Sequence, residues 1–164
     1  MIEVIGQLRQ WLSLADGVTI TGGEPFEQPD ALAGIVRWLD QEFDGDVLVY
    51  TGYSKARIQA ELDDVNGCID ALISEPFQHL ESDALPLRGS DNQELHFLTR
   101  RGLEQFSRYE HPEDGPALDA MFDEDGTVWF CGIPRRHDLE RLEIILQSRG
   151  HDAVFTAQDI RVEK

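Results

Sequence analysis

Short apolar runs alternate with amphipathic stretches over the first two thirds of the chain, and this alternation constrains the fold most strongly. The runs have strand length, are bounded by turn residues, and lie at 18–21, 47–50, 69–74 and 94–99. Helical spacing of apolar residues predicts helices at about 4–15, 29–43, 54–62 and 102–109, with Ser54 as a cap. Strands that alternate with helices imply right-handed βαβ units and a mainly parallel sheet.

The last third of the chain has a different pattern. A proline- and glycine-containing break at 111–116 precedes two strand-like runs at 118–122 and 127–130, and the turn sequence 123–126 separates them. A helix is predicted at 138–149, followed by a short apolar run around Val154 and Phe155. We expect residues 111–164 to form a hairpin and helix that extend the domain made by residues 1–110.

Residues 75–93 separate the third predicted strand from the fourth. They contain two prolines and little periodicity, which predicts a long ordered loop and not a helix. Loops of this length often carry function.

The turn after the first strand has unusual chemistry. Gly22, Gly23, Glu24 and Pro25 follow the apolar run directly, at the strand end where α/β proteins bind ligands. Two glycines admit positive φ and let a ligand reach the backbone, Glu24 can hold an amino group, and Pro25 fixes the exit direction. The four residues alone are equally compatible with a plain β-to-α turn.

Three segments in order resemble the radical S-adenosylmethionine (SAM) activating enzymes, closest to the anaerobic ribonucleoside-triphosphate reductase activating proteins. They are D-G-V-T-I-T-G-G-E-P-F-E-Q at 16–28, Y-T-G-Y at 50–53 and R-G-S-D-N-Q at 88–93. The resemblance covers about Met1 to Thr99. It implies that residues 1–110 form an incomplete radical-SAM-type (β/α) barrel.

The resemblance also implies a set of site residues. Gly22, Gly23, Glu24 and Pro25 would bind the methionine part of SAM, and Tyr50 and Thr51 would border the same ligand, although strand-end aromatics are more often packing residues. Arg88, Asn92 and Gln93 would face the partner protein or the mouth of the site.

The cluster motif of that family is absent. The family holds a [4Fe-4S] cluster with a C-x-x-x-C-x-x-C motif, whereas this sequence contains only Cys68 and Cys131, without ligand spacing. The resemblance implies that the chain starts at the first barrel helix, without the preceding strand and loop. A cluster would therefore need ligands from an upstream segment or a partner.

Metal sites of other kinds are not indicated. The five histidines show no H-x-x-x-H pair and no acidic companion at ligand spacing, and the acidic run 123–126 reads as a β-turn and not as a calcium loop. We predict no metal ligands in this chain.

The formal charge of −18 argues against nucleic acid as a partner, because 32 acidic residues face only 14 lysines and arginines. A solvated acidic surface that aids solubility is the simplest reading of the excess. No segment has the length and apolarity of a membrane span, and the amino terminus lacks the pattern of a signal peptide. We expect a soluble cytoplasmic protein.

Three functions fit these observations. The chain is a radical-SAM activating enzyme that cleaves SAM and installs a radical on a partner, one subunit of a split enzyme, or a cluster-free relative that binds SAM, a nucleotide or only a protein. Without a preceding strand, the strand at 18–21 would lie at a sheet edge with unpaired backbone groups. We therefore expect a homodimer or hetero-complex that covers this edge.

Overall fold

The computed structural model describes residues 2–81, 84–111, 118–122, 128–132, 138–148 and 150. The chain divides into two compact units, Met1–Gly115 and Pro116–Lys164. The first unit contains the segments that resemble the activating enzymes, and the second contains the predicted hairpin and helix. Each unit is described by itself.

The first unit is built on a four-stranded open sheet in the order β1-β2-β3-β4. The strands are β1 (Gly17–Ile20), β2 (Asp46–Tyr50), β3 (Ala71–Ser74) and β4 (Glu94–Phe97). β1 pairs with β2 and β2 with β3 in parallel, with Val18 opposite Val47 and Val49 opposite Leu72. The predicted α/β class and mainly parallel sheet are confirmed, and β1 occupies one edge of the sheet.

β4 runs antiparallel to β3, with Leu72 opposite His96. The reason is the connection between them, because the described residues of the 75–93 loop contain no helix or strand. A parallel return needs a crossover, usually a helix, that carries the chain back along the sheet. This loop instead turns at the carboxyl end of β3 and re-enters the sheet there.

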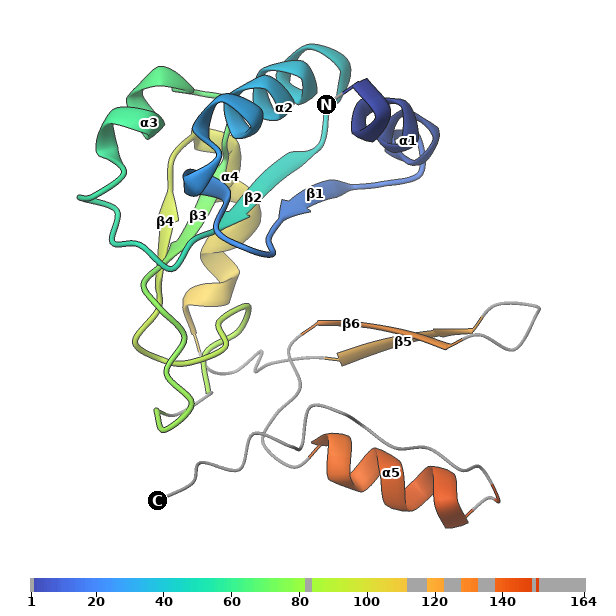
Figure 1. Cartoon of the computed structure of the whole chain (residues 1–164). Helices are drawn as coiled ribbons and strands as arrows, with labels where there is room; N and C mark the ends of the chain where they lie inside the picture. Colours follow the sequence, from blue (N-terminus) through green and yellow to red (C-terminus); the bar gives the residue numbers. More distant parts are fainter. Residues whose placement is uncertain are drawn as a thin grey trace. The chain divides into compact units, whose positions relative to one another are not determined.

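Helices cover both faces of the sheet (Figure 1). One face packs against α2 (Pro29–Glu42) and α3 (Gln59–Asp64), and the other against α4 (Arg100–Phe106). The strand residues alternate accordingly, since Val47 and Val49 join the α2 cluster and Leu48 joins the α4 cluster. α1 (Ile2–Leu12) meets the first cluster through the partly buried Leu12.

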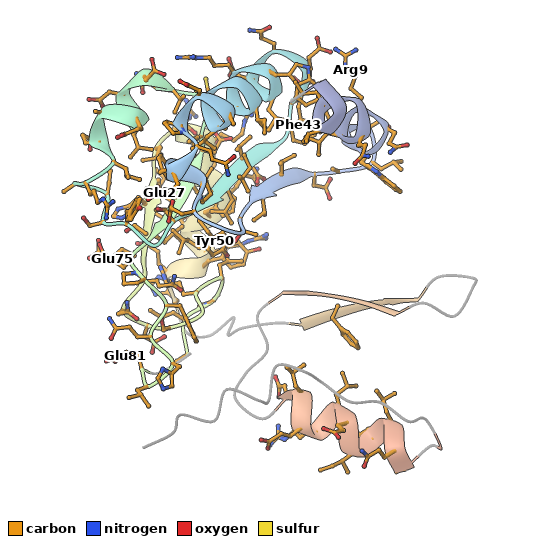
Figure 2. The ribbon with its side chains drawn as sticks, viewed as in Figure 1. Arg9, Glu27, Phe43, Tyr50, Glu75 and Glu81 are labelled. Atoms are coloured by element: carbon orange, nitrogen blue, oxygen red, sulfur yellow. The ribbon has the colours of Figure 1, made fainter. Side chains whose placement is uncertain are left out.

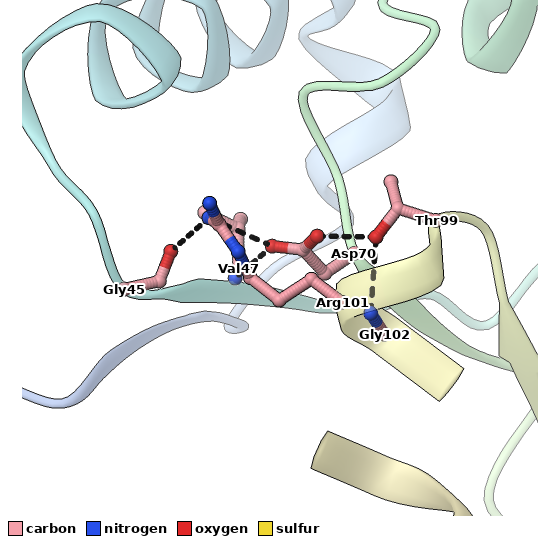
Figure 3. Close-up of polar contacts among 6 residues, drawn as sticks. All are labelled: Gly45, Val47, Asp70, Thr99, Arg101 and Gly102. Atoms are coloured by element: carbon pink, nitrogen blue, oxygen red, sulfur yellow. Dashed lines mark hydrogen bonds and ion pairs between the residues drawn. The ribbon is translucent and has the colours of Figure 1, made fainter. Parts of the chain in front are cut away.

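A buried carboxylate ties α4 to the sheet (Figure 3). Asp70 is only 5% exposed and accepts a hydrogen bond from the backbone N–H of Val47 at 2.9 Å and another from the Thr99 hydroxyl. Arg101 donates to the Gly45 carbonyl at 2.7 Å and lies 3.9 Å from the Asp70 carboxylate. A buried acid held in this way fixes the start of α4 against β2 and β3.

Two helix starts differ from the sequence prediction. Ser54 does not cap α3, because the helix begins later, at Gln59, and Ile58 is its N-cap. Ile58 makes no side-chain capping bond. Residues 54–58 form tight turns, in which the Ser54 carbonyl accepts a hydrogen bond from the Arg57 N–H. Thr99, predicted to end the fourth strand, instead caps α4 by accepting from the Gly102 N–H at 3.0 Å. After α4 the chain continues as the 3-10 helix η2 (Ser107–Glu110).

The second unit contains an antiparallel hairpin and one helix among its described residues. β5 (Leu118–Phe122) pairs with β6 (Val128–Gly132), and α5 spans Asp138–Ser148. The predicted hairpin and the predicted helix are confirmed. The described residues do not include the turn at 123–126, the break at 112–116 or the run at Val154 and Phe155. In the part of the chain that the structure covers, no helix has the length and apolarity to cross a bilayer.

Candidate ligand-binding site

The G-G-E-P turn follows β1 and the Y-T-G-Y segment lies at the end of β2, and the structure brings these two segments together. Because the two strands are parallel and adjacent, the loops that follow them leave the sheet at the same edge. Gly22 and Gly23 both have positive φ, 91° and 56°, and a Cβ added to either would meet nothing within 4 Å. The backbone conformation therefore favours glycine, and the space above both residues is open.

Glu24 connects the two loops through its carboxylate. Oε1 accepts from the Thr51 hydroxyl at 2.8 Å and from the Phe26 backbone N–H at 3.0 Å, and Oε2 accepts from the Gly52 N–H at 2.8 Å. The same residue caps the short 3-10 helix η1 (Pro25–Glu27), which Pro25 opens. A carboxylate has about four acceptor positions, so a single position on Oε2 remains for a ligand.

Thr51 is the buried part of this connection. Only 4% of the residue is exposed, and its hydroxyl, which donates to Glu24, also accepts from the Tyr53 N–H at 3.1 Å. Its own N–H donates to the Ile73 carbonyl at 2.9 Å, which continues the β2–β3 pairing. The Glu24 carboxylate is thus held by a residue that the sheet itself fixes.

Tyr50 and Thr51 lie on opposite faces of the sheet. The Tyr50 side chain packs with the α4 cluster, and its hydroxyl donates to the Leu87 carbonyl at 2.6 Å. Burial raises the pKa of the Tyr50 phenol to about 12, although the nearby Arg88 opposes the shift. The structure therefore brings Thr51 to Glu24 but joins Tyr50 to the 75–93 loop.

Tyr53 and Glu27 make a second link between the same two loops. The Tyr53 hydroxyl donates to the Glu27 carboxylate, and this hydrogen bond raises the pKa of the phenol. The Arg57 guanidinium lies over the Tyr53 ring, 3.3 Å from its centre. Figure 2 labels Glu27 near the carboxyl edge of the sheet.

The three residues of the 75–93 loop that were predicted to face a partner donate hydrogen bonds to main-chain carbonyls. The Arg88 guanidinium donates to the Tyr109 carbonyl at 3.3 Å, Asn92 donates to the Pro76 carbonyl at 2.9 Å, and Gln93 donates to the Glu75 carbonyl at 3.1 Å. Only 6% of Arg88 is exposed, and burial lowers the pKa of its guanidinium. Their assignment to a partner-facing surface remains a prediction.

A polar group at the ends of β3 and β4 was missed from the sequence. The buried Ser74 hydroxyl lies 2.9 Å from Nε2 of His96, and the Glu94 carboxylate lies 3.5 Å from the same nitrogen. Burial, with a smaller contribution from Lys55, lowers the pKa of His96. Next to Ser74, Glu75 adopts a left-handed backbone conformation with φ 77°. No local pattern could have paired Ser74 with His96, because their contact depends on the antiparallel register of β4.

The residues of this chain do not fit a [4Fe-4S] cluster. Such a cluster is held by cysteine thiolates, usually four, and the sequence contains two cysteines. Cys68 is a free, partly buried thiol whose pKa is raised by its burial, and it lies in the first unit, while Cys131 lies in the second. Among the described residues, no three or more His, Cys, Asp or Glu side chains are grouped to hold a metal ion.

The fold and the geometry of these residues define an α/β protein whose candidate site lies at the carboxyl ends of parallel strands. Residues 3–96, more than half of the chain, match the family described as the 4Fe-4S single cluster domain. The chain belongs to this family. No curated protein and no solved structure matches the chain. The family match contains the G-G-E-P and Y-T-G-Y segments and the loop between β3 and β4, so it covers the whole candidate site.

Proposed function

We propose that this protein is an activating-enzyme-like member of its family, which binds SAM at the carboxyl ends of β1 and β2 and acts on or with a partner protein. Membership of the 4Fe-4S single cluster family supports this proposal at a coarse level. The observation that carries it is the Glu24 carboxylate, which joins the G-G-E-P turn to Thr51 and Gly52.

The site residues suit the amino-acid end of SAM. The ammonium group of methionine is a donor and a cation, and the acceptor position left on Glu24 Oε2 offers a charge-assisted hydrogen bond. Gly22 and Gly23 leave their main chain without side-chain cover, so the ligand can approach the backbone directly. The existing bonds to Thr51 and Gly52 hold the carboxylate in place, which reduces the ordering cost of binding.

No step through an iron–sulfur cluster is derived for this chain, because its residues do not supply the ligands. Catalytic cleavage of SAM by this protein would require thiolates from outside these 164 residues.

The cysteine count favours a second candidate function. In it, the protein is a cluster-free, non-catalytic relative or one subunit of a split enzyme, and serves as a binding module. The two candidates differ in whether radical chemistry follows, and a cluster-free relative would bind SAM, a nucleotide or only a protein.

The free edge of β1 is the proposed contact for a second chain. β1 pairs with β2 on one side and has no strand on the other among the described residues. An edge of this kind exposes unpaired N–H and C=O groups, which proteins usually cover. We expect a homodimer or hetero-complex that covers this edge, and a monomer in light scattering of the purified chain at about 10 μM would count against this expectation.

Calorimetric titration of SAM into three variants tests the site. Glu24→Gln keeps the shape but removes the charge, so it should weaken binding more than about tenfold, equivalent to a contact of about 1.5–3 kcal/mol. Thr51→Val removes one hydrogen bond to the carboxylate but keeps its charge and should weaken binding less. Glu42→Gln, on the surface of α2 beside Arg9, is the control.

The outcomes separate two roles of Glu24. Equal losses in Glu24→Gln and Thr51→Val would mean that the carboxylate acts only by holding the loops together. Unchanged affinity in both variants would reject the site.

A further inference from the structure

The 75–93 loop exposes two large apolar side chains that are close together in the sequence. Phe77 is 63% exposed and Leu80 is 81% exposed, only three positions further along the chain. They lie beyond the carboxyl end of β3, on a loop and not on a helix or strand. Exposed apolar side chains that are grouped in this way mark interaction sites more often than scattered ones do.

A hydrogen bond to the buried Ser90 side chain holds this part of the loop. The Ser90 side chain, which is fully buried, accepts from the Gln78 N–H at 3.0 Å, directly after Phe77. The Phe77 ring lies so close to Gly89 that a Cβ there would come within 3.0 Å of it. One side of the ring therefore rests on Gly89 while most of the residue stays exposed.

Asn92 and Gln93 hold the same segment from the other end of the loop. Asn92 donates to the Pro76 carbonyl at 2.9 Å, and Gln93 accepts from the Gly89 N–H at 2.8 Å while donating to the Glu75 carbonyl. A segment that is held before binding loses little conformational freedom when it docks. These polar side chains thus position Phe77 and Leu80 for contact.

The charge of the loop indicates the chemistry of its partner. Residues 75–94 contain five carboxylates and a single arginine, and they include no lysine; the carboxylates are Glu75, Glu81, Asp83, Asp91 and Glu94. The arginine, Arg88, is 6% exposed and donates to the Tyr109 carbonyl in η2. The charges that this segment offers to a partner are therefore almost entirely negative.

The 75–93 loop begins at the carboxyl end of β3, on the same side of the sheet as the candidate site at the carboxyl ends of β1 and β2. Glu75 follows β3 directly, and its N–H donates to the Tyr53 carbonyl at 3.1 Å, in the loop that contains Thr51. Figure 2 labels Glu75 near this edge and Glu81 further out on the loop. A protein bound to the loop would lie beside the ligand site.

We infer that Phe77 and Leu80 are the contact residues for a partner protein that carries an apolar pocket with a lysine- and arginine-rich rim. Asn92, Gln93 and Ser90 act as positioning residues for this contact. The inference deepens the proposed function, on which it rests for the existence of a partner.

Photo-cross-linking in the cells that make the protein identifies the partner. Leu80 is replaced by p-benzoylphenylalanine in the full chain, and Leu14, which is 79% exposed, receives the same replacement as the matched control. We expect position 80 to cross-link one protein that position 14 does not. No cross-link at position 80, or one to a second copy of this chain, would overturn the inference.

Binding between the two purified proteins then tests the contact itself. Phe77→Ser and Leu80→Ser should each weaken binding about tenfold or more, whereas Leu14→Ser should change it less than about twofold. Raising the salt from about 50 to about 300 mM should also weaken binding, because it screens the charged rim. Full affinity in Phe77→Ser and Leu80→Ser, or no salt dependence, would contradict the inference.

SAM titration of the same variants separates this inference from the proposed function. Leu80→Ser should bind SAM like the unmodified protein, because its side chain is exposed on the loop and outside the site. Loss of partner binding with intact SAM binding supports the docking surface. Partner binding through Phe77 and Leu80 by a protein that does not bind SAM would reject the SAM site and retain the surface.

Discussion

Replacing Gly102 by alanine is expected to destabilise the first unit, opposite to the usual effect in helices. In a helix interior, alanine is normally favoured over glycine by about 0.5–1 kcal/mol. At Gly102, however, an added Cβ would lie 1.9 Å from the Asp70 carbonyl oxygen and 2.7 Å from its carbon. Both are backbone atoms, so no side-chain rotation can relieve the clash.

The cost follows from the movement required. To bring the Cβ from 1.9 Å to the 3.0 Å below which real contacts essentially never occur, α4 must retreat by 3.0 − 1.9 = 1.1 Å. Overpacking of this kind costs about 1–3 kcal/mol, and displacing α4 weakens the Thr99 cap, worth about 0.5–2 kcal/mol. After subtracting the helix preference of glycine against alanine, we expect a loss of about 2 kcal/mol, which corresponds to roughly 8 °C in Tm for a unit of this size.

Thermal unfolding followed by circular dichroism measures this loss, with Gly6→Ala as the control. Gly6 lies in α1, and a Cβ there would meet nothing within 4 Å. The control should therefore show the ordinary stabilisation of up to about 1 kcal/mol. If Gly102→Ala were as stable as the unmodified protein, the close packing of α4 on the Asp70 backbone would be wrong.

Three further predictions concern the other polar groups of the first unit. Burial lowers the pKa of His96 in the folded state, so the unfolded chain binds the proton first, and stability should fall as the pH drops below about 6.5. Chemical denaturation at several pH values measures this fall, and His96→Gln should flatten the dependence of the unfolding free energy on pH. Tyr50→Phe should cost about 1 kcal/mol in the free energy of unfolding, because it leaves the Leu87 carbonyl without its 2.6 Å hydrogen bond; an unchanged urea midpoint would refute that bond. Glu75→Gly should raise Tm, because it relieves a left-handed conformation that costs about 1 kcal/mol, and a lower Tm would show that the carboxylate stabilises the fold.

The sheet could be predicted because its signals are local. The apolar runs that became β1, β2 and β3 are short, lie between amphipathic helices and end at turn residues, so both their positions and their parallel order followed from the sequence. The direction of β4 was not drawn from the sequence, although a 75–93 segment without a crossover helix favours an antiparallel return. The path of this loop could not be predicted, because it is held by hydrogen bonds between residues far apart in the chain.

The candidate site was predictable in part for the same reason. Parallel neighbours end at one edge, so the approach of Glu24 to the segment after β2 was implied, although the specific bonds to Thr51 and Gly52 were not. The two-residue period of a strand places Val49 and Thr51 on one face and Tyr50 on the other, a signal that could have separated Tyr50 from the site.

The contact of Ser74 with His96 and the positioning role of Asn92 depend on tertiary structure. Each joins residues more than a dozen positions apart, and no spacing rule connects them. Polar residues in a long loop suggest binding to a partner. The sequence looks the same, however, when these side chains form hydrogen bonds with the backbone of the loop itself. Only the hydrogen-bond partners distinguish the two roles.

Calorimetric titration of SAM into the full chain tests the central claim most directly. The account predicts saturable binding at one site per chain and an affinity more than about tenfold weaker in Glu24→Gln. Heats equal to dilution with SAM at about 1 mM, or binding that Glu24→Gln leaves unchanged, would contradict the assignment of the β1 and β2 carboxyl ends as the SAM site.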